Sequence, residues 1–281
     1  MSIAAALSSG TPVIAAELRP PRAELALREG MDAWIDTYHA VRSLTRGGVY
    51  VFLTDSAVGL QEEDNLRHLV ANLGGDVPRE RVVPFLTSKH RLEYCLSYAG
   101  RAWQHDFQSL VVLGGDKSVG PPRSVEHAWQ LRQAIRRHEP RLTLGGWANP
   151  NRDVERQVEF LQAAEFTGEF YLTQIVSHHH VGPVAQFMEA GDKGGLELQG
   201  LFGVFFYRSA NPATLATLSR FLPVPADALA AEFASGATPV EVAARTIRAM
   251  MAVGVRHFYV SNLPLGRAES TLTAILNAVK A

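Results

Sequence analysis

The chain has 281 residues, of which 47% are hydrophobic and 20% charged, a composition typical of a globular protein with a substantial core. Lys and Arg number 27 against 28 Asp and Glu, and a net charge of −1 argues against nucleic acid or a membrane surface as a partner. No apolar run approaches the ~20 residues of a membrane span. Residues 1–11 lack the basic start of a signal peptide, and we expect them to be a flexible segment. The single cysteine, Cys95, excludes an internal disulfide and indicates a reducing, cytoplasmic compartment.

Short apolar runs rich in Val, Leu and Phe alternate along the chain with segments of helical periodicity. The runs that predict strands are Val13–Leu18, Val49–Leu53, Arg81–Leu86, Leu110–Leu113, Arg141–Leu144, Phe170–Leu172, Leu201–Phe206 and His257–Val260. The segments that predict helices are Ala23–Leu44, Gln61–Leu73, Arg91–Trp103, Pro121–His138, Asp153–Ala164, Val184–Glu189, several pieces between Asn211 and Val253, and Glu269–Val279. Strands that lack polar alternation are typical of a sheet buried on both faces, and helices between them make the strands parallel.

Eight strand–helix units in a chain of this length predict an α/β protein with a (β/α)8 TIM barrel. No linker-like tract separates the units, so residues 1–281 are expected to form a single domain. An open, doubly wound sheet is the alternative. Its dinucleotide-binding form is disfavoured, because no Gly-x-Gly-x-x-Gly turn follows the first predicted strand.

The first predicted strand ends at Glu17, shortly before the pair Pro20-Pro21. Proline has no N–H to donate to a sheet, so the strand stops there and the Glu17 carboxylate is expected at its mouth. A buried acid is costly unless it is paired, hydrogen-bonded or used in chemistry. Two hypotheses follow: a catalytic acid, or a structural ion pair with Arg19 or Arg22.

Barrels of this kind carry their active sites at the carboxyl ends of the strands. Polar or aromatic side chains follow nearly every predicted strand: Glu17; Thr54 and Asp55; Thr87 and Lys89; Asp116 and Lys117; Trp147 and Asn149; Gln174; Tyr207 and Arg208; Ser261 and Asn262. Loop capping explains many of them, but less easily Glu17, Asp116 and Gln174 together. Two carboxylates at one mouth have pKa values that are pushed apart, which suits one as a proton donor.

No metal-ligand spacing stands out in the sequence, and we expect no metal site. His178-His179-His180 is the tempting case. Adjacent residues point in different directions, so a solvated loop is the expected state of this stretch. Cys95 lies within a predicted helix, where a buried, inert thiol is expected.

Five strand-end motifs together point to a known family. They are Glu17-Leu18-Arg19-Pro20-Pro21, Leu86-Thr87-Ser88, Gly115-Asp116, Thr173-Gln174 and His257-Phe258-Tyr259-Val260-Ser261-Asn262, on the first, third, fourth, sixth and eighth predicted strands. In this order they resemble the methylenetetrahydrofolate reductase family, whose members form (β/α)8 barrels. The resemblance is distant but spans nearly the whole chain.

The resemblance implies an oxidoreductase of one-carbon metabolism and methionine biosynthesis that reduces 5,10-methylene-tetrahydrofolate to 5-methyl-tetrahydrofolate. The position that matches Glu17 gives a proton to the leaving nitrogen, and Asp116 faces the pterin and tunes its charge. Gln174 hydrogen-bonds the pterin, and Thr54 and Tyr207 complete the expected substrate site. The implied partner is a reduced folate, and a homo-oligomer is compatible with the sequence.

The resemblance also implies NAD(P)H and FAD as cofactors, with Phe85, Thr87, Gly115, Trp147 and Asn149 as the expected cofactor-binding residues. Four features depart from family members that hold FAD. Gly114 replaces an arginine, Phe85 replaces a histidine, Trp147–Asn151 replaces a histidine-containing loop, and Val158–Ala164 replaces a basic helix. We therefore expect that FAD is not retained stoichiometrically and that hydride comes directly from a nicotinamide, with Trp147 or Phe85 as a stacking wall.

Two other functions remain open at this stage. The chain is also compatible with a related enzyme that serves another one-carbon step, such as oxidation of methyl-tetrahydrofolate during demethylation. A non-catalytic barrel that binds a pterin or a partner protein is the other alternative.

Overall fold

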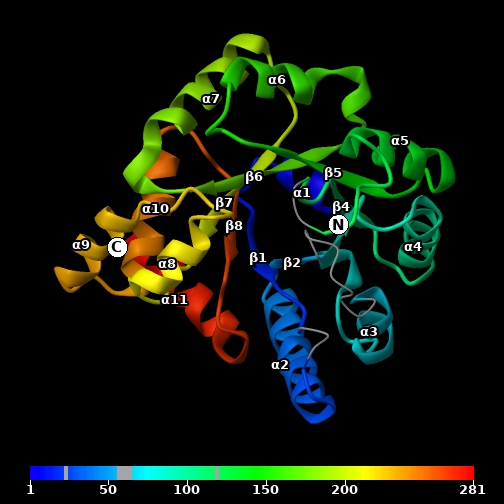
Figure 1. Cartoon of the computed structure of the whole chain (residues 1–281), viewed down its shortest axis with the longest axis horizontal. Coiled ribbons are helices and arrows are strands. Elements are labelled where there is room, and N and C mark those ends of the chain that lie inside the picture. The colour runs from blue at the N-terminus through cyan, green and yellow to red at the C-terminus, as the bar shows by residue number, and fades with distance from the viewer. Residues whose placement is uncertain (22–24, 56–64, 118–119) are drawn as a thin grey trace.

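Eight parallel strands close into a barrel in the computed structural model, which describes residues 1–21, 25–55, 65–117 and 120–281. The strands are β1 (Ile14–Leu18), β2 (Tyr50–Leu53), β3 (Val82–Thr87), β4 (Ser109–Leu113), β5 (Thr143–Ala148), β6 (Phe170–Val176), β7 (Gly200–Phe205) and β8 (Phe258–Ser261). Each strand pairs with the next along the chain, and β8 pairs with β1 (Figure 1). The predicted (β/α)8 barrel is confirmed.

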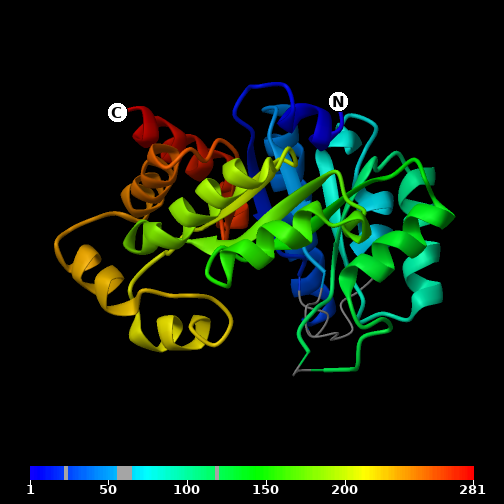
Figure 2. The same cartoon turned by 90° about the horizontal axis from the view of Figure 1, so that it is seen from above.

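Helices surround the barrel (Figures 1 and 2). They are α1 (Ile3–Leu7), α2 (Leu27–Arg46), α3 (Asn65–Asn72), α4 (Leu92–Gln104), α5 (Ala128–His138), α6 (Val154–Gln162), α7 (Val181–Gly194), α8 (Pro212–Leu218), α9 (Ala226–Ala234), α10 (Pro239–Ala252) and α11 (Ala268–Lys280), with short 3-10 turns η1 (Arg79–Arg81), η2 (Ala164–Phe166), η3 (His178–His180) and η4 (Leu265–Arg267). The predicted helix starts at Ala23 and Gln61, and Arg22, lie outside the described residues. No helix of the described ranges has an apolar stretch long enough to cross a membrane.

The strand residues divide into two apolar layers, because successive side chains point to opposite faces of a strand. Ala15, Phe52, Phe85 and Tyr259 belong to the cluster inside the barrel. Their neighbours, such as Ala16 in β1, pack with the helices outside. Both layers are apolar and buried, which explains why the strands read as continuous apolar runs in the sequence.

The amino-terminal segment differs from the expected flexible tail. Residues Ile3–Leu7 form α1, in which Ile3 and Leu7 are buried in the cluster that fills the barrel interior. The Tyr50 hydroxyl, at the first residue of β2, donates a hydrogen bond of 2.8 Å to the Met1 carbonyl. Helix α1 therefore covers the amino-terminal end of the barrel, where burial of its apolar side chains stabilises it.

Two helices also differ in extent from the prediction. Helix α5 begins at Ala128 and not at Pro121, because the preceding segment is held to the loop after β3: the Ser124 N–H donates to the Ser88 carbonyl at 2.6 Å. Helix α7 runs from Val181 to Gly194 and ends at Gly195, which has a positive φ of 65°. The predicted end at Glu189 is too early because the stretch that follows still forms helical hydrogen bonds.

Candidate active site

Glu17 occupies the fourth position of β1, one residue before the strand ends. It lies in register with Phe52 of β2 and Ser261 of β8, and its place in the strand alternation matches Ala15, which faces the barrel interior. The Ser261 hydroxyl donates a hydrogen bond of 2.8 Å to Glu17 Oε1. The carboxyl group is therefore held at the carboxyl-terminal end of the barrel, as the sequence predicts.

The environment of Glu17 favours its protonated form. Burial raises the pKa of the carboxyl group above its ordinary value, and the hydrogen bond from Ser261 offsets this only in part. Arg19, one expected ion-pair partner, is exposed, and Glu17 makes no ion pair within the part of the chain that the structure describes. The geometry thus favours an acid that holds its proton more tightly than an exposed glutamate over a structural ion pair.

Gln174 and Asp116 approach the same end of the barrel from other strands. Gln174 is the fifth of seven residues in β6, and Asp116 follows the end of β4 by three residues. All strands are parallel, so their carboxyl ends meet on one side. The main-chain N–H of Ile175 donates to Gln174 Oε1 at 2.9 Å, which leaves the amide NH2 group as the donor toward a ligand.

A hydrogen-bonded network fixes β6 against β7 and β8 beside this end. The Tyr259 hydroxyl donates to the Thr173 carbonyl at 2.6 Å, and the Gly203 N–H donates to Thr173 Oγ1 at 3.2 Å. Gly203 must lack a side chain, because a Cβ there would overlap the Tyr259 ring. The network holds the β6 backbone next to Gln174.

Thr54 and Thr87, two further predicted site residues, are engaged through their main chain. The Thr54 N–H donates to the Leu18 carbonyl at 3.1 Å, and the Thr87 N–H donates to Asp55 Oδ2 at 2.8 Å. His90 Nε2 lies 2.9 Å from the same Asp55 oxygen. The pair of Asp55 and His90 ties the end of β2 to the loop after β3, and sequence analysis missed it because His90 lies three residues past the strand.

The glycine pair after β4 is covered by an arginine from the same loop, which connects β4 to α5. Gly115 has a φ of 73°, and its carbonyl accepts a hydrogen bond from the Arg123 guanidinium. The same guanidinium lies where a side chain on Gly114 would begin. Position 114 has no arginine, but the guanidinium of Arg123, nine residues further along the chain, lies beside it.

The residues expected at the cofactor side have different exposures. Phe85 is buried in the barrel interior with its ring centroid 5.8 Å from that of Phe52, whereas Trp147 is only half-buried. Trp147 therefore offers more ring surface to a ligand than Phe85. Asn149 Oδ1 accepts from the Asn151 N–H at 3.0 Å, which shapes the loop after β5.

Two cations near this side, Lys89 and Arg156, have partners in the structure. Lys89 Nζ donates to the Pro121 carbonyl at 2.8 Å. Helix α6 exposes Glu155 and carries a single arginine, Arg156, which lies 5.3 Å from the centroid of the Phe160 ring. The sequence prediction overlooked Arg156, yet the helix still offers an acidic surface.

Tyr207 lies just after β7 in a separate apolar cluster with Leu229 of α9 and Val242 of α10. Its hydroxyl is buried without a hydrogen-bond partner in the described structure, and burial raises its pKa to about 12. A buried hydroxyl without a partner loses its hydration and gains nothing in return. The Tyr207 hydroxyl is either a cost to stability or a contact reserved for a ligand.

We expect the Tyr207→Phe variant to unfold with an unchanged or slightly higher free energy, because no hydrogen bond is lost. The matched variant is Tyr259→Phe, which leaves the buried Thr173 carbonyl without the hydrogen bond from the Tyr259 hydroxyl. Its free energy of unfolding should fall by about 1–3 kcal/mol. Denaturant unfolding of both variants measures the difference. Equal losses would mean that the Tyr207 hydroxyl has a partner in solution.

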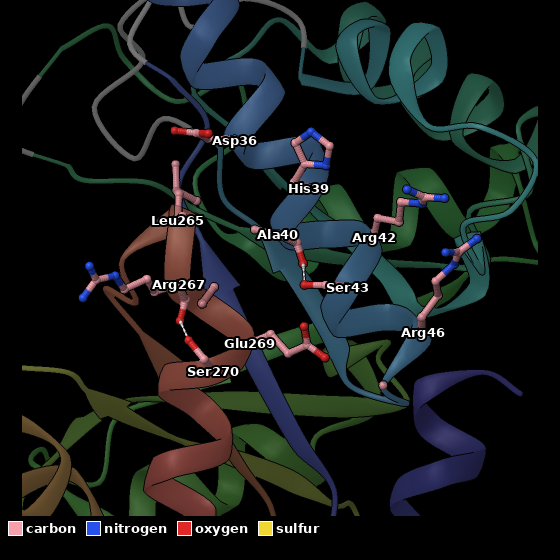
Figure 3. A pocket seen from close by; sticks show the side chains of 13 residues that line it. Asp36, His39, Ala40, Arg42, Ser43, Arg46, Leu265, Arg267, Glu269 and Ser270 are labelled. Carbon is pink, nitrogen blue, oxygen red and sulfur yellow. Dashed lines mark hydrogen bonds between the residues drawn. The ribbon is translucent and has the colours of Figure 1, made fainter.

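An open groove of about 780 Å³ lies away from the strand ends, on the outer wall of the barrel (Figure 3). It runs between the second half of α2 and the start of α11, and no strand residue lines it. Its basic side chains are Arg42, Arg46 and Arg267, with Asp36 and Glu269 as the acidic ones. None of the predicted site residues belongs to this groove.

The architecture belongs to the class of (β/α)8 barrels with a carboxyl side chain at the end of the first strand. No family model matches the chain, and no curated protein matches it. Among solved structures, it is similar to an uncharacterized protein from Clostridium thermocellum that binds two copies of 5-methyl-5,6,7,8-tetrahydrofolic acid. The TM-score is 0.68 at 14% sequence identity, over 98% of this chain and 96% of that chain. At this identity the similarity shows a shared fold.

Proposed function

We propose that this barrel binds a reduced folate at the carboxyl ends of its strands and reduces 5,10-methylene-tetrahydrofolate to 5-methyl-tetrahydrofolate. The observation that carries the proposal is Glu17, a partly buried acid with a raised pKa at the end of β1. The structural neighbour that binds 5-methyl-tetrahydrofolate, the expected product, supports the choice of ligand.

In the proposed reaction, Glu17 protonates the nitrogen that leaves the methylene bridge. The electron pair of the breaking carbon–nitrogen bond stays on that nitrogen, and the bridging carbon becomes a double-bonded iminium carbon. A hydride, which a reduced nicotinamide supplies, then adds to this carbon and makes the methyl group. Glu17 ends as a carboxylate and regains its proton from water, so each turnover consumes one hydride and one proton. The hydrogen bond from Ser261 to Glu17 Oε1 stabilises that carboxylate and keeps it in place.

The other strand-end residues would position the pterin. Gln174 has its amide NH2 directed to a ligand because its oxygen is already used by Ile175. Asp116 would balance positive charge that develops on the ring system, and Thr54 would lie next to Glu17 along the rim. Trp147 offers an aromatic surface for the nicotinamide.

We infer that FAD is not part of the resident site. A diphosphate requires free cations or N–H donors, but Lys89 and Arg123 donate to carbonyls and Arg156 follows an acidic residue on α6. Each missing charge-assisted hydrogen bond is worth about 1.5–3 kcal/mol, so losing two weakens binding by a few decades in Kd.

The absorbance spectrum of freshly purified protein is expected to lack a flavin band at one equivalent per chain. Reconstitution with added FAD should leave most of the flavin in the filtrate after ultrafiltration. Retention of one FAD per chain would contradict the inference and would point to Arg123 as its phosphate ligand.

The function itself is tested by two measurements on the same preparation. Binding of 5-methyl-tetrahydrofolate is measured by calorimetry, and oxidation of NADH or NADPH is followed with and without 5,10-methylene-tetrahydrofolate. Binding together with folate-dependent oxidation supports the proposal. Binding without turnover in either direction would assign the chain to the non-catalytic pterin binders, and absence of folate binding would overturn the proposal.

A further inference from the structure

Two of the three consecutive histidines are gathered with a distant glutamate on one side of the barrel. His178 and His179 lie in η3, directly after β6, and Glu232 lies in α9, within the excursion between β7 and β8. The three side chains are partly or largely buried, with exposed fractions of 16%, 21% and 9%. The solvated loop expected for this stretch is therefore wrong: it is a 3-10 turn that packs against α10.

The ligand atoms of these residues converge on one point. Nε2 of His178 lies 3.1 Å from Glu232 Oε2, and Nε2 of His179 lies 3.0 Å from the same oxygen. The two rings are only 3.9 Å apart between centroids. Tetrahedral Zn²⁺, with ligand bonds of about 2.0–2.2 Å, requires ligand atoms roughly 3.4 Å apart, so a small expansion would admit an ion.

Thr246 of α10 lies against the ring of His178. Thr246 Oγ1 lies 2.8 Å from His178 Nδ1 and 3.2 Å from the Val242 carbonyl, to which the hydroxyl can donate its proton. In the tautomer with the proton on Nδ1, the histidine donates to Thr246 Oγ1, and Nε2 presents a lone pair toward Glu232. A metal-bound imidazole requires this tautomer, with its other ring N–H held by a hydrogen-bond acceptor.

The two oxygens of the Glu232 carboxylate have different partners. Oε2 lies 3.1 Å from His178 Nε2 and 3.0 Å from His179 Nε2, whereas the Arg245 guanidinium contacts Oε1. Oε2 and the two ring nitrogens are therefore gathered as three ligand atoms close enough to hold one ion.

We propose that His178, His179 and Glu232 bind a divalent cation of the zinc class, with Thr246 as the residue that orients His178. Two imidazoles and one carboxylate form a ligand set typical of Zn²⁺, and the fourth position is left for water. The ion would fasten the end of β6 to α9 and α10. These helices also carry Leu229 and Val242, which pack on Tyr207, so the ion would stiffen the rim near the proposed folate site. The cation site does not depend on the folate reaction.

The test is a titration of the full chain with Zn²⁺ after treatment with a chelator. Wild-type protein is expected to bind one equivalent with micromolar or tighter affinity, and Co²⁺ in the same site should give the visible absorption of a four-coordinate ion. Glu232→Gln and His179→Ala are expected to weaken binding at least 100-fold. Thr246→Val should weaken it 10–100-fold, as is usual for residues that orient a metal-bound histidine.

His180→Ala is the matched control, because His180 is exposed in the same turn and lies outside the cluster. This variant should bind Zn²⁺ like wild type, and added Zn²⁺ should raise its Tm equally. Circular dichroism checks that each variant is folded. Failure of wild-type protein to bind one equivalent overturns the proposal by itself, whatever the variants do. Equal binding by Glu232→Gln, His179→Ala and wild type would also overturn it.

Discussion

Replacement of Glu17 by glutamine is expected to lower turnover by about 10²–10⁴-fold while folate still binds. The amide keeps the size of the side chain and can accept the hydrogen bond from Ser261, but it has no proton to give. The wild-type rate should fall as pH rises through the pKa of Glu17, because only the protonated acid is active. That pKa lies above the ordinary value of 4.5 for a glutamate, so activity should extend to higher pH than a solvent-exposed glutamate would allow.

Stability separates this catalytic effect from structural damage. Because the pKa of Glu17 is higher in the folded chain than in the unfolded chain, the folded state binds more protons. Stability is then lost as pH rises from the unfolded pKa through the folded one, and ionised Glu17 is a cost at neutral pH. Glu17→Gln should thus be at least as stable as wild type. The surface variant Glu159→Gln should match wild type in both rate and stability, and a Glu17→Gln rate within threefold of wild type would remove Glu17 from the mechanism.

The Phe170→Ala variant is expected to lose about 3–5 kcal/mol in free energy of unfolding. Phe170 begins β6, is 0% exposed, and fills the barrel interior next to Gly145, where a Cβ would overlap its ring. Truncation leaves a cavity that the closed ring of strands cannot collapse to fill, because each strand is hydrogen-bonded on both sides.

Phe160→Ala is the matched control for that variant. Phe160 is 52% exposed on α6, and the Arg156 guanidinium lies 5.3 Å from the centroid of its ring. Its loss should stay within about 1 kcal/mol. Chemical denaturation of both variants gives the comparison, and similar losses would mean that the barrel interior is not packed as described.

The fold could be predicted from the sequence because the apolar runs and the helical periodicities mark the order of strands and helices along the chain. Each apolar run was buried on both faces, and each lay one helix away from the next, which allows little else than a parallel closed sheet. The segment of residues 1–11 was predicted less well. Short helices such as α1 have no periodicity of their own to read, and Ile3 and Leu7 are buried by the barrel and not by their neighbours in sequence.

The site was partly predictable for a related reason. Glu17 and Gln174 lie inside their strands, where position along the strand fixes the end of the barrel to which they belong. Contacts between side chains far from the strands could not be predicted. Arg123 folds back onto Gly114 within the loop between β4 and α5, and Glu232 meets His179 across 53 residues of chain. Sequence spacing carries no signal for such pairs, because the path of the loop and the packing of the helices bring them together.

Helix α1 has a practical consequence for anyone who handles this protein. Ile3 is fully buried at the amino-terminal end of the barrel. Met1 is 63% exposed, and its carbonyl accepts a hydrogen bond from the Tyr50 hydroxyl. An affinity tag or dye joined to the amino terminus therefore leaves from the face opposite the strand ends that carry Glu17 and Gln174. A molecule anchored to a sensor surface through that tag would present the carboxyl ends of its strands to the flowing solution. Removal of the chain up to Leu7 would instead expose the amino-terminal end of the barrel interior.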